Sequence, residues 1–324
     1  MKRYTLAAML LSIVVLACVI PGAATSPVAI PTTDPNALAT IIVGTAQVLA
    51  AQTVAAAQSS VPTATLIPDM IDASGVPMRL VPAGTFMMGN DNGNDDEKPA
   101  HLVDLPDYYI DKYEVTNKQY AACVSGGGCT PPSGTSSYTR PSYYDNSEFD
   151  EFPVINVNWN QANAYCSWAG CELPTEAQWE KAAGWNDLEQ KKYVYPWGNN
   201  FNGSIVNFCD KNCTLDWADK NSDDGFADTS PIMNYPNGVS PYGAYDMGGN
   251  VWEWVSDWYS ETYYQSSPSS NPLGPDSGEY RVLRGGSWGS GGADVSVRSA
   301  IRTGNVPTNS SDNLGFRCAR GISP

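Results

Sequence analysis

The chain has 324 residues, of which 42% are hydrophobic and 16% are charged, a composition that excludes a disordered chain and allows a large folded core. Its 29 glycines, 24 prolines, 10 tryptophans and 18 tyrosines are typical of a loop-rich domain with aromatic packing and few long helices. The formal net charge of -16 repels nucleic-acid phosphates and anionic lipid headgroups, so neither is an expected partner.

Residues 1–22 have the features of an export signal. Lys2 and Arg3 precede an apolar run from Leu6 to Ile20, which is the charged start and short apolar segment of such a signal. The run contains Val-Leu-Ala-Cys18, which is similar to the lipobox of bacterial lipoproteins, so Cys18 is the predicted lipidation site. Because Leu16 is larger than the usual residue there, a plain signal peptide and an uncleaved anchor helix stay open as alternatives. The sequence predicts an exported protein, held at the cell surface by a lipid or by an N-terminal helix.

Residues 23–73 have the composition of a stalk. They are rich in Ala, Thr, Pro, Ser and Val and hold almost no charge or aromatic residue. Within them, residues 36–58 are uncharged and rich in alanine, and Asp34 and Pro35 are typical of a helix start. This segment is interpreted as a helical spacer or a self-associating stalk. A membrane span is the less favoured alternative, because its threonines and glutamines make it only weakly hydrophobic.

The eight cysteines can be oxidised if the protein is exported. Their spacing predicts two local disulfides, Cys123–Cys129 and Cys209–Cys213, each closing a short loop. A zinc site is disfavoured because the chain has one histidine, His101, and lacks the tandem pairs that zinc uses. Loss of Cys18 from the count leaves seven cysteines, so at least one thiol is predicted to be unpaired.

The folded part is predicted to begin near Met78. Two short apolar runs on either side of Pro82-Ala-Gly84 indicate a β-hairpin. Residues 90–97 are acidic and contain glycine, so they are interpreted as a solvated loop. Residues 101–116 alternate as strands do, and His101 is interpreted as a structural strand residue.

Three helices are predicted, and the polar residues expected to cap them are, in chain order, Thr116 with Asn117, Asn158 or Asn160, and Thr175. The second helix follows a buried strand that starts at Pro153, and it places Tyr165 and Cys166 on one face. The third helix directs Trp179 into the core.

Residues 243–258 combine three tryptophans, three acidic side chains and two adjacent glycines. The glycines permit a tight turn with positive φ. Asp246, Asn250 and Glu253 bring side-chain oxygens close to carbonyls that such a turn leaves without partners. The stretch is therefore compatible with a cation site or with an ordinary glycine turn between two strands.

Seven blocks, taken in order, are similar to those of one family: Val81–Phe86, Glu114–Asn117, Leu173–Glu180, Tyr195–Asn199, Gly248–Trp254, Arg284–Trp288 and Gly315–Cys318. Over residues 76–321 the chain resembles the formylglycine-generating enzyme family, also called the sulfatase-modifying factor domain family. The resemblance implies an α+β, C-type lectin-like fold, rich in loops, with short strands and few helices.

The resemblance also implies metal sites and a disulfide. One calcium site would use the side chains of Asp246 and Glu253 and the carbonyls of Gly249 and Val251. A second would use the side chains of Asn207 and Asp224 and the carbonyls of Phe208 and Phe226. These sets contain only oxygen ligands, as calcium requires. The implied disulfide joins Cys166 to Cys318 and leaves Cys171 as the odd thiol.

The chain departs from the family where the chemistry lies. The enzymes oxidise a substrate cysteine with copper held by two cysteines shortly after the Arg-Gly-Gly-Ser block. The corresponding residues 288–298 contain no cysteine, and Ser290 and Asp294 or Val295 stand near those positions. Because Cu(I) prefers thiolates, copper and the oxidase reaction are disfavoured. The single histidine likewise disfavours the three-histidine iron site of related members.

The segment from Trp288 to Asn313 is small and polar, which suits adaptable hydrogen bonding on a rigid scaffold. The predicted ligand-binding residues are Trp288, Ser290, Asp294, Arg298, Arg302, Asn305, Asn309 and Asn313. The sequence thus predicts a non-catalytic domain that binds a protein, peptide or glycan. Three alternatives stay open: a loop without a ligand, an oxidase of the formylglycine-generating type acting by another route, and a surface display protein diversified by a retroelement.

Overall fold

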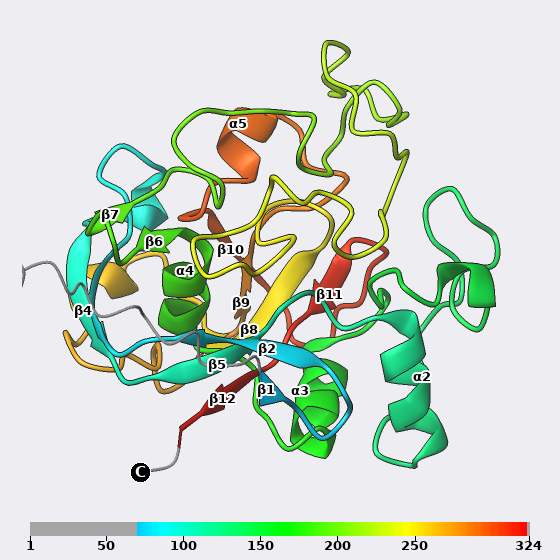
Figure 1. Cartoon of the computed structure of the whole chain (residues 1–324), viewed down its shortest axis with the longest axis horizontal. Helices are drawn as coiled ribbons and strands as arrows, with labels where there is room; N and C mark the ends of the chain where they lie inside the picture. Colours follow the sequence, from blue (N-terminus) through cyan, green and yellow to red (C-terminus); the bar gives the residue numbers. More distant parts are fainter. Residues whose placement is uncertain (1–69, 323–324) are drawn as a thin grey trace, which may run out of the picture. The chain divides into compact units, whose positions relative to one another are not determined.

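A computed structural model describes residues 70–322 of the chain (Figure 1). The predicted signal, the lipidation site Cys18 and the helix predicted over residues 36–58 lie outside the described residues. Within residues 70–322, none of the helices has the length and apolar character needed to cross a membrane.

All three predicted helices are confirmed. The α-helices of the described part are α2 (Asn117–Ser125), α3 (Trp159–Trp168), α4 (Glu176–Gly184) and the short α5 (Ala293–Ser296), with 3₁₀ turns η1 (Asp95–Glu97), η2 (Ser147–Phe149) and η3 (Tyr263–Gln265). Thr116, Asn158 and Thr175 each accept a hydrogen bond from the backbone N–H three residues later and complete a capping box. Local side-chain chemistry therefore sets where these helices begin.

The strands are short and form two four-stranded sheets and two pairs. Their bounds are β1 (Met70–Ile71), β2 (Pro77–Val81), β3 (Gly84–Met88), β4 (His101–Leu105), β5 (Tyr108–Asp111), β6 (Trp185–Asn186), β7 (Lys191–Lys192), β8 (Trp252–Trp258), β9 (Arg281–Arg284), β10 (Arg302–Asn305), β11 (Leu314–Phe316) and β12 (Ala319–Gly321). The sheets run in the orders β1-β2-β5-β12 and β10-β9-β8-β11, and the pairs are β3-β4 and β6-β7. This mixture of short strands and few helices confirms the predicted α+β class.

The predicted hairpin around Pro82 is wrong. β2 pairs with β5 and β3 pairs with β4, so β2 and β3 follow one another along the same bent ladder instead of pairing. Pro82 has no N–H to donate, and Gly84 has a φ of 135°, so the strand breaks and changes direction between them. The hairpin that does form joins residues 77–88 to residues 101–111 through the loop 89–100.

The predicted strand after Pro153 is also wrong. Residues 153–157 make one isolated bridge, between Pro153 and Thr116. Asn156 has a φ of 59°, which interrupts an extended ladder. Val154 and Val157 are buried, so the apolar run correctly indicates a buried segment, but that segment is not paired in a sheet.

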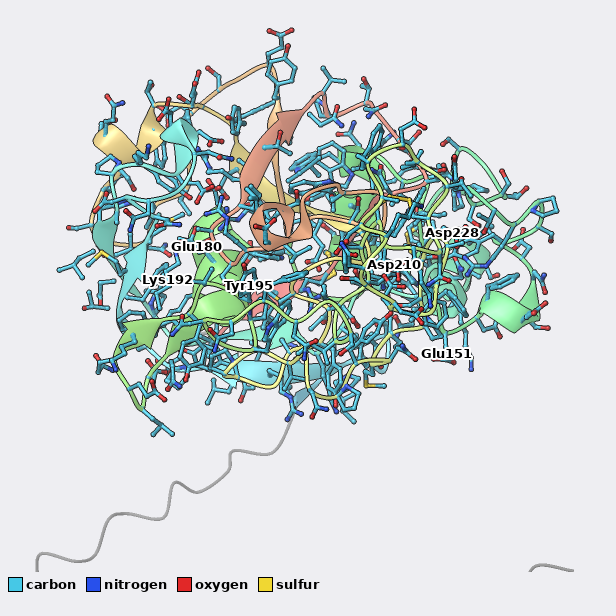
Figure 2. All side chains as sticks on the ribbon, turned by 90° about the horizontal axis from the view of Figure 1, so that it is seen from above. Glu151, Glu180, Lys192, Tyr195, Asp210 and Asp228 are labelled. Carbon is cyan, nitrogen blue, oxygen red and sulfur yellow. A yellow bond between two sulfur atoms is a disulfide. The ribbon has the colours of Figure 1, made fainter. Side chains whose placement is uncertain are left out.

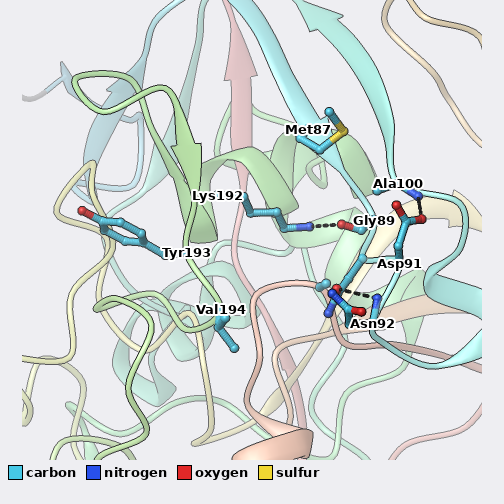
Figure 3. A pocket seen from close by; sticks show the side chains of 10 residues that line it. Met87, Gly89, Asp91, Asn92, Ala100, Lys192, Tyr193 and Val194 are labelled. Carbon is cyan, nitrogen blue, oxygen red and sulfur yellow. Dashed lines mark hydrogen bonds between the residues drawn. The ribbon is translucent and has the colours of Figure 1, made fainter.

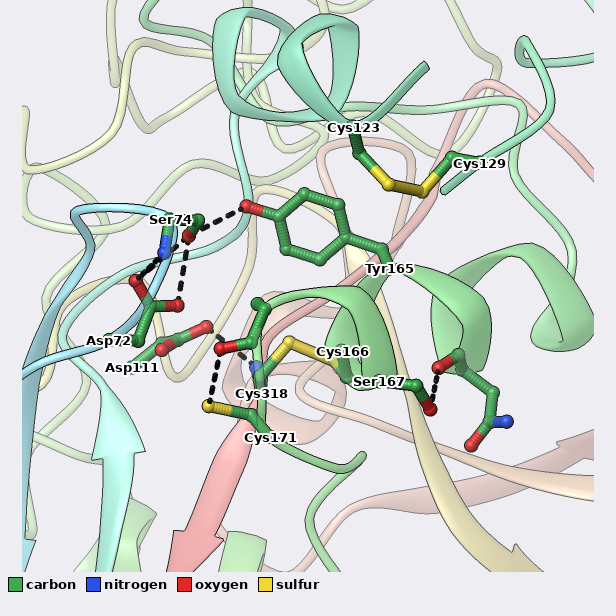
Figure 4. Close-up of a disulfide and its surroundings, with 12 residues drawn as sticks. Asp72, Ser74, Asp111, Cys123, Cys129, Tyr165, Cys166, Ser167, Cys171 and Cys318 are labelled. Atoms are coloured by element: carbon green, nitrogen blue, oxygen red, sulfur yellow. Dashed lines mark hydrogen bonds between the residues drawn. A yellow bond between two sulfur atoms is a disulfide. The ribbon is translucent and has the colours of Figure 1, made fainter. Parts of the chain in front are cut away.

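Three disulfides hold the described part together, and they are those predicted: Cys123–Cys129, Cys166–Cys318 and Cys209–Cys213. The second spans 152 residues and joins α3 to the chain between β11 and β12 (Figure 4). Cys171 has no disulfide partner, as predicted. The long bridge ties the C-terminal segment to the first half of the fold.

Candidate functional site

The predicted ligand face is only partly exposed. Trp288 is 4% exposed, and its indole N–H donates to the carbonyl of Asp312 at 3.0 Å. The predicted residues that keep access to solvent are Ser290, Asp294, Asn305, Asn309 and Asn313. Trp288 therefore supports the face from below.

The two predicted arginines are held by buried carboxylates. Arg298 donates to Glu97 through both terminal nitrogens, at 2.8 and 2.6 Å. Arg302 donates to Glu176 through Nε at 2.7 Å and Nη2 at 2.8 Å. Because both guanidinium groups are bound inside the fold, these arginines position the face and offer little free charge to a ligand.

The loop before β4 forms one wall of the site. Residues 90–97 were expected to be solvated, yet Glu97 is fully buried against Arg298. Arg302 donates to the carbonyl of Asp96 at 3.0 Å, and Tyr259 donates to the carboxylate of the same residue at 2.9 Å. The expectation is wrong for Glu97, because a buried cation replaces the water that an acidic loop would otherwise require.

A pocket of about 450 Å³ lies on the sheet formed by β8 to β11, and we call it the sheet pocket. Trp252 contributes apolar surface, while Leu283 and Leu314 are each 2% exposed, and the polar lining includes Asn94, Thr303, Arg302, Asn305 and Asn313. Its size and its mixture of apolar and polar groups are those of small-ligand sites. Three of the predicted ligand residues line it. Asn94 and Trp252 were not predicted, because neither belongs to the segment from Trp288 to Asn313.

Two further depressions adjoin the acidic loop. The smaller is about 240 Å³ (Figure 3) and the other is about 500 Å³. They share Asn90, Asn92 and Val194. The second includes Asp294 and Arg298, and it shares Asn94 with the sheet pocket. We call the two together the asparagine groove. The groove and the sheet pocket therefore meet at Asn94.

A buried charge network lies behind the smaller depression. Lys192 donates to the carbonyl of Gly89 at 2.7 Å and pairs with Glu180, which also pairs with Arg284 (Figures 2 and 3). Burial alone would raise the pKa of Glu180, but the two cations lower that pKa to about 2. Since Lys192 is committed to this network, it anchors the wall of the groove.

Another loop packs against the start of the run that corresponds to the copper site of the family. The carbonyl of Ser290 accepts a hydrogen bond from the backbone N–H of Cys209 at 3.3 Å. Trp217 donates its indole N–H to the carbonyl of Gly289 at 2.9 Å. Asp294 and Val295, the two candidates for the second position, are both exposed, Val295 to 44%. The structure therefore brings no thiol to these two positions and places the loop 209–219 against the first.

The first predicted calcium set does not fit a metal well. Glu253 accepts three hydrogen bonds, two from Arg317 and one from the Trp179 indole, each at 2.7 Å. Asp246 accepts from the backbone N–H of Met233 at 3.0 Å. A metal at this position would have to compete with the Arg317 guanidinium for the carboxylate. The predicted side-chain ligand Glu253 acts here as half of a buried ion pair.

The second predicted calcium set fits a cation better. The amide oxygen of Asn207 is buried, and in the described part of the chain it has no hydrogen-bond partner. Burial raises the pKa of the nearby Asp224 carboxyl to about 7, and this carboxylate accepts backbone N–H groups from Phe208 and Phe226. Within residues 70–322, no group of three or more His, Cys, Asp or Glu side chains is arranged so that it could hold a metal ion. A cation here would be held by one carboxylate, one amide oxygen and the carbonyls of Phe208 and Phe226.

The glycine turn before β8 is built against this second set. A Cβ on Gly249 would lie 2.1 Å from the carbonyl of Asn207, so no other residue fits there. Asn250 donates its backbone N–H to the same carbonyl at 2.9 Å. Glu114 accepts from the backbone N–H of Val251, the other predicted carbonyl ligand of the first set, at 3.2 Å. The turn thus joins the two predicted metal regions into one scaffold.

Solved structures share this fold. PvdO from Pseudomonas aeruginosa superposes with a TM-score of 0.63 at 24% identity, over 79% of this chain and 99% of its own. Treponema denticola variable protein 1 superposes with a TM-score of 0.60 at 25% identity, over 76% of this chain and 95% of its own. The fold is that of the C-type lectin-like, formylglycine-generating class of proteins.

Sequence comparison assigns the family. Residues 65–322 match the sulfatase-modifying factor enzyme 1-like domain, and the chain belongs to that family. It is 35% identical to the formylglycine-generating enzyme of Streptomyces coelicolor, over 74% of this chain and 87% of the enzyme. It is also 33% identical to the inactive C-alpha-formylglycine-generating enzyme 2 of Bos taurus, over 76% of this chain and 88% of that protein. These matches confirm the resemblance found in the seven sequence blocks.

Longer relatives carry the same domain. The serine/threonine-protein kinase Pkn1 of Chlamydia trachomatis is 34% identical over 76% of this chain, but the match spans 38% of the kinase.

Proposed function

We propose that this chain is a non-catalytic, ligand-binding member of the sulfatase-modifying factor family. The observation that carries the proposal is the site that corresponds to the copper cysteines. Ser290 and Asp294 or Val295 stand near those positions, none of them a cysteine, and the indole of Trp217 donates to the carbonyl of Gly289 beside the first position. A serine hydroxyl with a carboxylate or an isopropyl group cannot supply the thiolates that Cu(I) requires. The name of the inactive Bos taurus relative is consistent with a family member that has lost the reaction.

The ligand we propose is a protein, peptide or glycan bound across the sheet pocket and the asparagine groove. Apolar floor residues supply contact area, and the rim amides of Asn94, Asn305 and Asn313 supply directional hydrogen bonds. The buried pairs Arg298–Glu97 and Arg302–Glu176 hold the two walls in register, which lowers the entropy lost on binding. We further propose that the domain acts outside the cell, carried by the segment 23–73 and anchored through Cys18.

A copper and oxidation assay tests the non-catalytic part of the proposal. The mature protein is titrated with Cu(I) and incubated with a cysteine-containing sulfatase peptide under oxygen, with the Streptomyces coelicolor enzyme as positive control. We expect no stoichiometric copper binding and no formylglycine product. Stoichiometric binding together with turnover would overturn the proposal and restore the oxidase alternative.

A binding screen tests the other part. The protein is applied to a glycan array and to a displayed peptide library, and each hit is repeated with Asn305→Ala and Asn313→Ala. A matched control is Leu188→Ala, because Leu188 is 98% exposed and lies outside both depressions. Hits that weaken only in the two asparagine variants support the proposed site. Glycans or peptides that bind the unaltered chain and all variants equally would show that the ligand site lies outside the sheet pocket.

We propose a second candidate function, surface display of a diversified sequence, because of the likeness to a protein named as variable. Asn305, Thr308 and Asn309 are partly or fully exposed on the C-terminal segment where such change would be displayed. Genomic DNA around the gene provides the test. A nearby copy that differs only at adenines, next to a reverse transcriptase gene, is expected. Absence of both contradicts this candidate and leaves the binding proposal standing.

A further inference from the structure

Two exposed aromatic side chains lie beside the run that starts at Trp288. Tyr138 is 45% exposed and Trp217 is 58% exposed. The Tyr138 ring lies 5.0 Å from the Trp288 ring, and its hydroxyl lies 3.2 Å from the Thr214 hydroxyl in the loop that carries Trp217. Two loops that are distant in sequence therefore present their rings from one region of the surface.

The orientation of the Trp217 indole is fixed by the glycine-rich turn beneath it. Its N–H donates to the carbonyl of Gly289 at 2.9 Å. A Cβ on Gly291 would lie 2.4 Å from the indole Cδ1, so the ring packs directly against the backbone of this glycine. Because the polar edge of the ring is bound while more than half of the side chain stays exposed, a ligand could use the ring at little entropic cost.

The charge around the two rings is negative. Residues 209–224 contain five aspartates and two lysines. Lys211 is paired with Asp223 at 2.6 Å, and Lys220 donates to the carbonyl of Cys213 at 3.1 Å. Asp216, directly before Trp217, is exposed and has no hydrogen bond or ion pair to any residue of the described part. The unpaired carboxylate of Asp216 and the exposed face of the Trp217 indole both attract a cation, and they lie side by side in the sequence.

We propose that Tyr138, Asp216 and Trp217 form a docking surface for a basic peptide segment. A Lys or Arg side chain of the partner lies over the Trp217 face and is neutralised by Asp216, while Tyr138 contacts the neighbouring residue. The net charge of -16 draws such a segment towards the chain. The surface shares no lining residue with the sheet pocket or the asparagine groove. A negative result for this docking surface would therefore not contradict the function proposed for the sheet pocket and the asparagine groove.

Calorimetry with short peptides tests the proposal. The probe is acetyl-Gly-Arg-Gly-Arg-Gly-Arg-amide in 150 mM salt, and the same peptide with Glu in place of Arg is the charge control. We expect the basic peptide to bind and the acidic one not to bind. Trp217→Ala should weaken binding about tenfold or more, and Tyr138→Ala and Asp216→Asn about threefold to tenfold, as expected for lost cation–π and charge contacts.

Leu188→Ala serves as the matched control, since it removes an exposed apolar side chain from the β6–β7 turn and leaves the proposed surface intact. Unchanged melting temperatures show that the variants fold. Equal affinity of Trp217→Ala and the unaltered chain would contradict the proposal, because binding would then reflect net charge alone. Binding of cellohexaose that depends on Trp217, without binding of the basic peptide, would overturn it in favour of a glycan.

Discussion

Arg298 and Glu97 lie 201 residues apart in the sequence and form a bidentate ion pair inside the fold, with nitrogen–oxygen distances of 2.8 and 2.6 Å. Arg298 follows the short helix α5, and Glu97 ends the 3₁₀ turn η1 in the loop before β4. The pair therefore fixes the distance between the two walls of the asparagine groove. Because Glu97 is fully buried and Arg298 is 8% exposed, the removal of one partner leaves a largely buried charge without compensation.

Glu97→Gln is expected to lower the free energy of unfolding by about 3 to 5 kcal/mol, the cost of breaking a buried pair by changing one partner. The matched control is Lys98→Gln, whose exposed pair with Asp95 is worth less than about 1 kcal/mol. Urea denaturation at constant m-value measures both changes. Similar losses in the two variants would show that the Arg298 pair contributes no more than a surface contact.

Asp257 should make stability depend on pH. Burial raises the pKa of its carboxyl to about 7, and the neighbouring Glu176 carboxylate adds to the rise. Since the unfolded pKa is near 4, the folded state binds the proton more tightly, so the free energy of unfolding falls as pH rises from about 4 to about 7. Asp257→Asn should remove the contribution of Asp257 to this decrease in the free energy of unfolding with pH. Urea denaturation at pH 4.5, 6 and 8 measures it.

Asp276→Asn supplies the control for this experiment, because it makes the same chemical change at an exposed aspartate. Asp257→Asn keeps an oxygen that can accept from the backbone N–H of Glu176, which Asp257 now accepts at 2.8 Å. A slope that survives in Asp257→Asn would assign the pH dependence to other carboxyl groups.

The helix starts that the sequence predicted correctly depend on local contacts, whereas the disulfide Cys166–Cys318, which spans 152 residues, was implied by the family resemblance. Thr116, Asn158 and Thr175 cap their helices through backbone groups three residues away, so the signal and its effect lie in one short stretch. The hairpin at Pro82 was mispredicted because a strand's partner depends on residues far along the chain. Apolar runs show that a strand is buried, but they do not show which strand lies beside it.

The candidate site was predictable only in part for the same reason. The composition of residues 288–313 indicated a polar face, and Asn305 and Asn313 do line a pocket. Arg298 and Arg302 are paired with carboxylates more than a hundred residues away in the sequence. Because the sequence does not show these partners, both arginines were predicted to contact a ligand. The sequence analysis did not predict that the loop before β4 forms a wall of the site. The acidic residues that follow Gly93, up to Glu97, were the feature of the sequence that could have indicated it.

Removal of a bound cation should destabilise the second metal region. If calcium is held by Asn207 and Asp224, excess EDTA lowers the melting temperature by mass action on the folded state, and added calcium restores it. At a calcium concentration a hundred times Kd, the stabilisation is about 2.7 kcal/mol. Asp224→Asn should lose this response, whereas Asp216→Asn, at an exposed carboxylate of the same loop, should keep it. Differential scanning fluorimetry measures the shifts, and a response unaffected by Asp224→Asn contradicts this assignment.

Cys171 should be unreactive while the protein is folded. It lies beside the Cys166–Cys318 disulfide (Figure 4), and burial together with the Asp111 and Asp72 carboxylates raises the pKa of its thiol to about 12. Since the thiolate is the nucleophile, iodoacetamide at pH 8 should modify Cys171 far more slowly than a free cysteine of ordinary pKa. In denaturant without reductant, the three disulfides stay closed and Cys171 should be the one thiol of residues 70–322 that iodoacetamide modifies rapidly. Mass spectrometry of the labelled peptides distinguishes the two states. Rapid labelling of the native protein at Cys171 would mean that the thiol is accessible and ionised, and that the burial deduced from its surroundings is wrong.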